Sequence, residues 1–303
     1  MIIIFLIYFG TLMRNFARRI VRSLYNRLFA TPEQLSLPQP MPLDQWPLFA
    51  RDAYESLMAQ SRPAVGLVPD YDREVPNEAV SSIAGRPSLP EGFDWPEDED
   101  GKPLLFLMQV NYTQHPSLEN HPKSGLLVAF MEEYYESARL FYFEDPSILV
   151  RRDLPDHIYP DNPFSVNLHR QGAPLDGHLF ESQIDWGAAE VDQIVESWWP
   201  AEDEDMLPDD EAAIISKMDN ELRARLEIDP PYDFYIGGHP VLRQGDPRKF
   251  DRGKLLESEV VLQMGSDIRA VNFGDSGTAV FFATPQDLRS MNVSDIGFDC
   301  SSL

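Results

Sequence analysis

The chain has 303 residues, 43% of them hydrophobic and 11% aromatic, which is enough apolar material for a substantial core. It carries 50 acidic and 25 basic side chains, and the formal charge of −25 excludes a protein that binds nucleic acid over its whole surface. The single cysteine, Cys300, excludes an intramolecular disulfide and any metal motif that needs two cysteines, and it favours a reducing, cytoplasmic location.

Residues 1–31 form an apolar and basic arm without any acidic side chain. Residues 1–13 are almost wholly apolar, but a membrane-spanning helix needs about 20 residues. After residue 13, apolar side chains recur every four residues and arginines fall between them, which predicts an amphipathic helix. The apolar residues are Phe16, Ile20, Leu24 and Leu28, and the arginines are Arg14, Arg18, Arg19, Arg22 and Arg27.

Three interpretations of this arm stay open. A basic amphipathic helix can lie in a membrane interface, which would associate the protein with a membrane through residues 1–30. The same apolar stripe can instead pack on the body of the protein, or translation can begin at Met13. A Pro-rich connector with a short helix over residues 48–60 follows, so residues 32–62 separate the arm from the body.

The body, residues 63–303, contains two similar stretches of sequence. Each begins with the pattern G-x-P-x-L-x-x-G, continues with an apolar strand that holds a glutamine, Gln109 or Gln263, and ends with a second apolar strand. The patterned residues are Gly85, Pro87 and Gly92 in the first loop, and Gly238, Pro240 and Gly245 in the second. Glycine permits positive φ, and proline restricts the turn of each loop.

These repeats predict an α+β fold of duplicated, mostly antiparallel β units, preceded by the helical arm. The units cover residues 80–143 and 233–291 approximately, with an acidic helical insertion over about 144–232. In the insertion we expect helices over residues 188–199 and 209–227. The second has one apolar face, formed by Ile214, Met218, Leu222 and Leu226.

The motifs of residues 85–109, 236–240, 274–277 and 299–300 together resemble the YwqG family of bacterial proteins, which is also catalogued as a domain of unknown function of DUF1963 type. The resemblance implies an α+β fold with duplicated antiparallel β units. It brings no established reaction, cofactor or catalytic residue. The chain departs from the family where Ala84 precedes Gly85, because a pair of glycines is usual there, and at Phe273, where tryptophan is frequent.

Gln109 and Gln263 are candidate site residues, because an amide inside an apolar strand must find partners. One interpretation is structural, with a backbone edge of the facing unit as partner. The other is contact with a small ligand in a cleft between the units, lined also by Trp95 and Asp275.

The sequence predicts no catalytic residue, metal site or cofactor. Gly274-Asp275-Ser276-Gly277 matches the nucleophile motif of some serine proteases, but the chain has no recognisable segment to supply the histidine base. The glycine-rich patterns of dinucleotide and P-loop phosphate sites are also missing from the sequence.

The segment between Gln171 and Ser216 holds 13 acidic residues and no lysine or arginine. It is either a solvated acidic surface or a docking face for a basic protein, with Trp198 and Trp199 as aromatic anchors. We therefore expect a non-catalytic binding or protein-interaction module. Toxin immunity is one specific role that such a module can have. The alternatives are a small-ligand binder or enzyme that uses the cleft, and a membrane-peripheral scaffold.

Overall fold

The computed structural model describes residues 40–132, 137–155, 172–199, 208–227, 229–242, 244–249, 258–267, 269–274, 277–293 and 296–301. The predicted N-terminal arm, residues 1–31, lies outside the described residues, and so does the candidate site residue Asp275. None of the described helices combines the length and the apolar character that crossing a membrane requires.

Helices and strands are interspersed along the chain. The helices are α3 (Leu48–Met58), α4 (Ala189–Glu196), α5 (Asp209–Leu226) and α6 (Pro285–Ser290), with 3-10 turns at Leu43–Gln45, Tyr112–Gln114, Pro146–Ile148 and Pro247–Lys249. The strands of the first half are β1 (Arg62–Pro69), β2 (Ser82–Ile83), β3 (Ser88–Leu89), β4 (Leu105–Asn111), β5 (Leu126–Met131), β6 (Ala138–Phe143) and β7 (Val150–Arg151). Those of the second half are β8 (Ala173–Ser182), β9 (Phe234–Gly237), β10 (Glu259–Gly265), β11 (Thr278–Ala283) and β12 (Gly297–Ser301).

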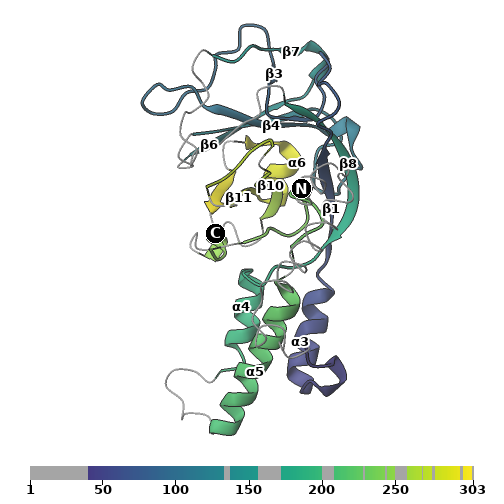
Figure 1. The fold of residues 1–303 in the computed structure, drawn as a ribbon, viewed down its shortest axis with the longest axis vertical. Helices are drawn as coiled ribbons and strands as arrows, with labels where there is room; N and C mark the ends of the chain where they lie inside the picture. The colour runs from purple at the N-terminus through teal and green to yellow at the C-terminus, as the bar shows by residue number, and fades with distance from the viewer. Residues whose placement is uncertain are drawn as a thin grey trace, which may run out of the picture.

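One ten-stranded sheet, in the order β12-β11-β10-β9-β1-β8-β2-β4-β5-β6, dominates the described part of the chain. Neighbouring strands are antiparallel, and β3 and β7 form a separate antiparallel pair. The sheet is nearly closed, because it curls through β1 and β8 and brings β4 and β6 across from β10 and β11 (Figure 1). The predicted α+β class with mostly antiparallel strands is confirmed at this level.

The strand pair β4–β5 on one side of the sheet and the strand pair β10–β11 on the other side have equivalent pairing registers. Gln109 pairs with Val128 in β4 and β5, and Gln263 pairs with Val280 in β10 and β11. A register irregularity follows Phe106 on one side, and another follows Val260, which stands at the equivalent position, on the other side. Two strands pair outside their own half of the chain: β1 of the first half pairs with β9, and β8 of the second half pairs with β2.

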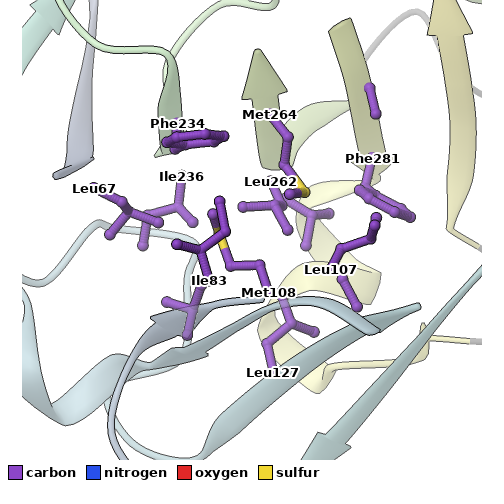
Figure 2. Packing of buried hydrophobic residues seen from close by; sticks show 14 of the residues in the cluster. Leu67, Ile83, Leu107, Met108, Leu127, Phe234, Ile236, Leu262, Met264 and Phe281 are labelled. Atoms are coloured by element: carbon purple, nitrogen blue, oxygen red, sulfur yellow. The ribbon is translucent and has the colours of Figure 1, made fainter. Parts of the chain in front are cut away.

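The core has three apolar layers. The inner layer fills the space between the two sides of the curled sheet, where Ile83, Leu107 and Met108 approach Leu262 and Phe281 (Figure 2). One outer layer lies between β4, β5, β6 and the loop segment of residues 79–104. The other lies between β9, β10, β11 and the helices α3, α4 and α5.

The helices α3, α4 and α5 lie side by side and project from one end of the curled sheet (Figure 1). We call these three helices the helical lobe. The predicted insertion over 144–232 is helical only in part, because it also contains β7 and β8, and β8 is a central strand of the sheet. The sequence prediction placed α3 in the connector of residues 32–62, apart from the insertion, whereas the structure packs it against α5.

The prediction for the apolar face of α5 was wrong at one residue. Ile214 is 46% exposed, whereas Ile215, Met218, Leu222 and Leu226 are buried. A strict four-residue repeat rotates by about 40° per step around an α-helix, so Ile214 drifts out of the buried stripe. Ile215 stays within the stripe because it stands three residues before Met218.

Candidate functional site

The two patterned loops lie on the outer faces of the sheet and begin with a pair of residues at positive φ. Gly237 and Gly238 adopt φ of +70° and +73°, and Ala84 and Gly85 adopt φ of +54° and +70°. Gly92 and Gly245 also have positive φ. Ala84 therefore occupies a left-handed conformation that is strained for a residue with a Cβ atom.

Gln109 fastens the first loop to the sheet. Its Oε1 accepts a hydrogen bond from the Ser88 backbone N–H at 2.7 Å, and its Nε2 donates to the Val80 carbonyl at 2.6 Å and to Ser88 Oγ at 3.2 Å. The backbone partner predicted for this amide belongs to the loop of its own side of the sheet, not to the facing unit. The reason is that the side chain points outward, away from the other side.

Gln263 fastens the second loop in the same manner but less completely. Its Oε1 accepts a hydrogen bond from the Val241 backbone N–H at 3.3 Å, while its buried Nε2 has no hydrogen-bond partner among the described residues. Val241 stands where the first loop has Ser88, so the hydroxyl that would accept from Nε2 is replaced by a hydrocarbon.

The structure does not bring the predicted ligand-binding residues together. Gln109 belongs to the outer face that contains Val128, and Gln263 belongs to the opposite outer face, with Val280. Trp95 packs against Phe130 and donates from Nε1 to the Leu104 carbonyl at 2.8 Å. Apolar side chains fill the space between the two sides of the sheet (Figure 2). Asp275 lies outside the described residues, as stated above.

The two outer faces carry different side chains where the loops approach the sheet. In the first loop, Phe93 packs against Phe141 and Trp95 packs against Phe130. The offset of 153 residues that relates Gly85 to Gly238 also relates Phe93 to Asp246 and Trp95 to Arg248. An aromatic pair on one side of the sheet is thus replaced by a charged pair on the other.

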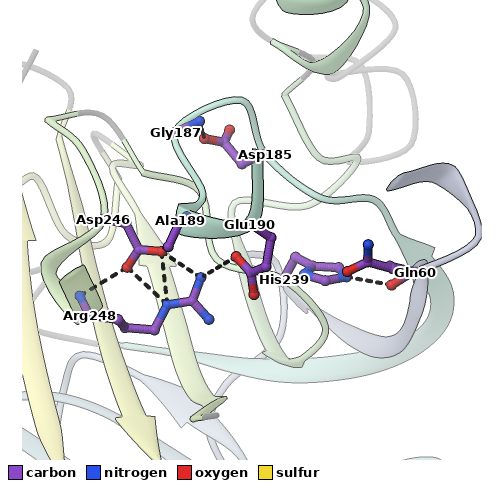
Figure 3. A network of polar contacts seen from close by, with 8 residues as sticks. All are labelled: Gln60, Asp185, Gly187, Ala189, Glu190, His239, Asp246 and Arg248. Carbon is purple, nitrogen blue, oxygen red and sulfur yellow. Dashed lines mark hydrogen bonds and ion pairs between the residues drawn. The ribbon is translucent and has the colours of Figure 1, made fainter. Parts of the chain in front are cut away.

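This charged pair joins the sheet to the helical lobe (Figure 3). The Arg248 guanidinium binds Asp246 in a bidentate manner, with Nε 2.9 Å from Oδ1 and Nη2 2.6 Å from Oδ2, and both side chains are buried. Asp246 Oδ2 also accepts the Ala189 backbone N–H at 2.9 Å, at the beginning of α4, and Arg248 Nη2 reaches Glu190 at 3.3 Å. Burial opposes the charge of Arg248, but the bonds to Asp246 and the two carboxylates outweigh it and raise the pKa of the guanidinium.

A second connection ties the second loop to α3. The buried imidazole of His239 lies with Nε2 2.6 Å from the Gln60 carbonyl, just after α3, and its backbone N–H donates to Ser182 Oγ at 3.0 Å (Figure 3). Burial lowers the pKa of His239 to about 4, so the ring is neutral and donates from Nε2. The second loop therefore holds both α3 and α4 against the sheet.

The distal end of the lobe carries an exposed aromatic surface. Phe49 in the first turn of α3 contacts Trp198, just after α4, with ring centroids 5.2 Å apart in a T-shaped arrangement. Leu48, Phe49 and Trp199 are 61%, 39% and 42% exposed. We call Leu48, Phe49, Trp198 and Trp199 the distal patch.

Acidic side chains predominate on the helices that carry the distal patch. The helices α3, α4 and α5 together carry ten acidic and four basic side chains. The exposed acidic residues are Asp52, Glu55, Glu196, Asp209, Asp210 and Glu211. Those at the beginning of α5 also interact favourably with the helix dipole, so their position is stabilising as well as accessible.

A serine and a histidine also meet in the body. Ser81 Oγ lies 2.6 Å from His115 Nε2, but Ser81 is only 1% exposed and its hydroxyl accepts the Asn111 backbone N–H at 2.8 Å. Burial lowers the pKa of His115 to about 4. A nucleophile must reach its substrate, so this buried pair is part of the packing. Among the described residues, no three His, Cys, Asp or Glu side chains could hold a metal ion together.

Sequence reasoning identified Trp198 and Trp199 but missed Phe49, Asp246 and Arg248. The repeat alignment held the signal for the last two, because comparing the positions of the two loops reveals the exchange of aromatic for charged residues. Nothing in the local sequence distinguishes Phe49 from a residue of the core, since its exposure depends on how α3 packs against the lobe.

A search of curated proteins finds no match to this chain. A family model described as domain of unknown function (DUF1963) matches residues 81–300, which begin one residue before β2 and end one residue before the end of β12. The match includes both patterned loops, both glutamines and the whole of α4 and α5. Because it covers well over half of the chain, this protein belongs to the DUF1963 family.

Proposed function

We propose that the protein is a non-catalytic interaction module whose helical lobe binds a basic protein partner. The observation that carries this proposal is the distal patch, an exposed group of aromatic and aliphatic side chains on helices with an excess of carboxylates. Tryptophan and phenylalanine provide much of the binding energy when they are buried in an interface. Surrounding charges of one sign steer a partner of the opposite sign and exclude like-charged competitors.

The joint between sheet and lobe supports this role. Asp246 and Arg248 fix the beginning of α4, and His239 fixes the chain just after α3. Each helix that carries part of the distal patch is therefore held at its opposite end. A preorganised surface loses less conformational entropy when it binds. One form of this function is toxin immunity, in which the acidic lobe would cover a cationic toxin surface.

We also infer that the body arose from two copies of one β unit. The equal strand order, the register of Gln109 and Gln263, and the bulges at equivalent positions support this inference. In this interpretation the two copies diverged, so that one carries an aromatic pair at Phe93 and Trp95 and the other carries Asp246 and Arg248, which contact the helical lobe.

The test is affinity capture from cell extract with the full chain, with the captured proteins identified by mass spectrometry. We expect a basic protein that is released by raised salt and is not captured by Trp199→Ala or Glu196→Lys. A matched control changes an exposed apolar residue and an exposed acid in the segment that follows β6, Ile148→Ala and Glu144→Lys, and should capture normally. Capture that is identical for all four variants would overturn the proposal.

A further inference from the structure

The first described residues of the chain contact the helical lobe. The Met41 backbone N–H donates to Glu221 Oε2 at 2.9 Å, and the Met41 carbonyl accepts from Arg225 Nη2 at 2.7 Å and from Trp46 Nε1 at 3.2 Å. The Arg225 guanidinium also lies over the rings of Trp46 and Tyr54. These bonds fix Met41 to the side of α5 and so tether the chain there.

This tether places the basic arm within reach of the whole lobe. Twelve residues separate Leu28 from Met41, and a chain of that length spans up to about 40 Å when extended. Helix α5, with 18 residues, is about 27 Å long. The distal patch thus lies inside the volume that the segment of residues 14–28 can sample.

The arm and the distal patch are complementary in charge and in polarity. Residues 14–28 contain five arginines and no acidic residue, and their apolar side chains recur at helical spacing. The lobe offers the opposite charge and an exposed apolar surface of similar kind. An amphipathic helix in an apolar groove is an established mode of peptide recognition, and attachment to the same chain raises its effective concentration to the order of millimolar.

We propose that residues 14–28 of this chain bind the distal patch and compete with the basic partner. This inference rests on the proposed function for its biological meaning, because it names the regulation of the same surface. The arm then acts as an internal occupant that a partner must displace. A weak partner is excluded by this competition, and a partner with stronger cationic and apolar contacts is admitted.

The experiment uses the full chain with a bimane fluorophore attached at Ser23→Cys, next to Leu24. Burial raises the pKa of the Cys300 thiol to about 12, so the native cysteine remains a protonated, poorly reactive thiol during labelling. Tryptophan quenches bimane on contact. We expect quenched emission that is recovered by Trp198→Phe with Trp199→Phe, by Arg18→Glu with Arg22→Glu, and by high salt.

The matched control carries the label at Ser147→Cys, an exposed position on the sheet body, and its emission should respond to none of these changes. Ser23→Cys emission that is equal with and without the two tryptophans would overturn the inference. So would a change in the environment of the label that requires anionic vesicles of phosphatidylglycerol, because the arm would then bind membranes.

Partner capture separates this inference from the proposed function. If the arm competes, Arg18→Glu with Arg22→Glu increases the amount of basic partner captured by the full chain. If capture depends on Trp199 while the label is never quenched, the proposed function stands and the internal occupant is excluded. If the label is quenched by the two tryptophans while no basic protein is captured, the internal occupant is supported and the proposed function is excluded.

Discussion

Gln109 and Gln263 occupy the same register position on opposite outer faces of the sheet, yet only Gln109 satisfies its whole amide. Gln109 makes three hydrogen bonds to the loop above it, whereas Gln263 makes one, at 3.3 Å, and leaves Nε2 unpaired. Two acceptors account for the difference, since Gln109 Nε2 reaches both the Val80 carbonyl and the Ser88 hydroxyl, whereas Gln263 Nε2 reaches no equivalent carbonyl in the described part of the chain and Val241 has no hydroxyl.

This asymmetry predicts unequal costs for the same substitution. Gln109→Leu should destabilise the protein by about 2–4 kcal/mol, because it leaves the Ser88 N–H and the Val80 carbonyl unpaired in a buried position. Gln263→Leu should cost about 1 kcal/mol or less, since it removes an amide that is already unsatisfied. Urea unfolding of both variants measures the two values, and equal losses would contradict the inequality.

The strained backbone at Ala84 offers a stabilising substitution. Ala84→Gly should raise the free energy of unfolding by about 1 kcal/mol, because glycine adopts φ of +54° without the clash that a Cβ atom causes. The reverse change on the other side, Gly237→Ala, should destabilise, since the new Cβ would stand 2.5 Å from Leu118 Cδ1. Thermal unfolding of the pair tests the prediction, which fails if Ala84→Gly lowers the melting temperature.

The joint between sheet and lobe should tolerate removal of both charges better than removal of one. Arg248→Met or Asp246→Asn alone should each cost about 3–5 kcal/mol, because the remaining partner stays buried without a full complement of bonds. The double variant Asp246→Leu with Arg248→Met should be milder, as Phe93 and Trp95 show that apolar residues fit the equivalent site. Chemical unfolding followed by far-UV circular dichroism measures both effects, and an additive double variant would argue against coupling.

Buried histidines make the protein sensitive to mild acid. Burial lowers the pKa of His115, His121 and His239 to about 4, from an ordinary value of 6.5. Between these values the unfolded chain binds protons that the folded chain does not, so stability falls as pH falls from 6.5 toward 4. Each histidine should cost about 2 kcal/mol at pH 5 relative to pH 7.5.

Two carboxyls oppose this trend, because burial raises the pKa of Asp219 and Asp299 and lets the folded chain bind their protons first. Three histidines act against these two carboxyls, so we expect the stability to fall on balance as the pH falls. Urea unfolding at pH 7.5 and pH 5.0 measures the difference, and His239→Gln, which keeps a donor near the Gln60 carbonyl, should reduce it. A loss that His239→Gln leaves unchanged would show that other groups are responsible.

The sequence by itself determined the local features of this protein. The repeat of loop, glutamine strand and apolar strand predicted where β4, β5, β10 and β11 would form, because continuous apolar runs bounded by turn residues are local signals of buried strands. Helical periodicity predicted α5 to within a residue or two, and the acidic composition predicted an accessible surface around Trp199.

Only the tertiary structure decided which residues meet. Gln109 and Gln263 share a pattern that suggested one cleft, but the curl of the sheet turns them to opposite outer faces. The pairing of β1 with β9 and of Phe49 with Trp198 joins segments that are far apart in the chain, and no local propensity encodes such contacts. Long-range packing fixed the distal patch because the exposure of a side chain depends on its neighbours in space, whereas sequence periodicity reports only its neighbours along the chain.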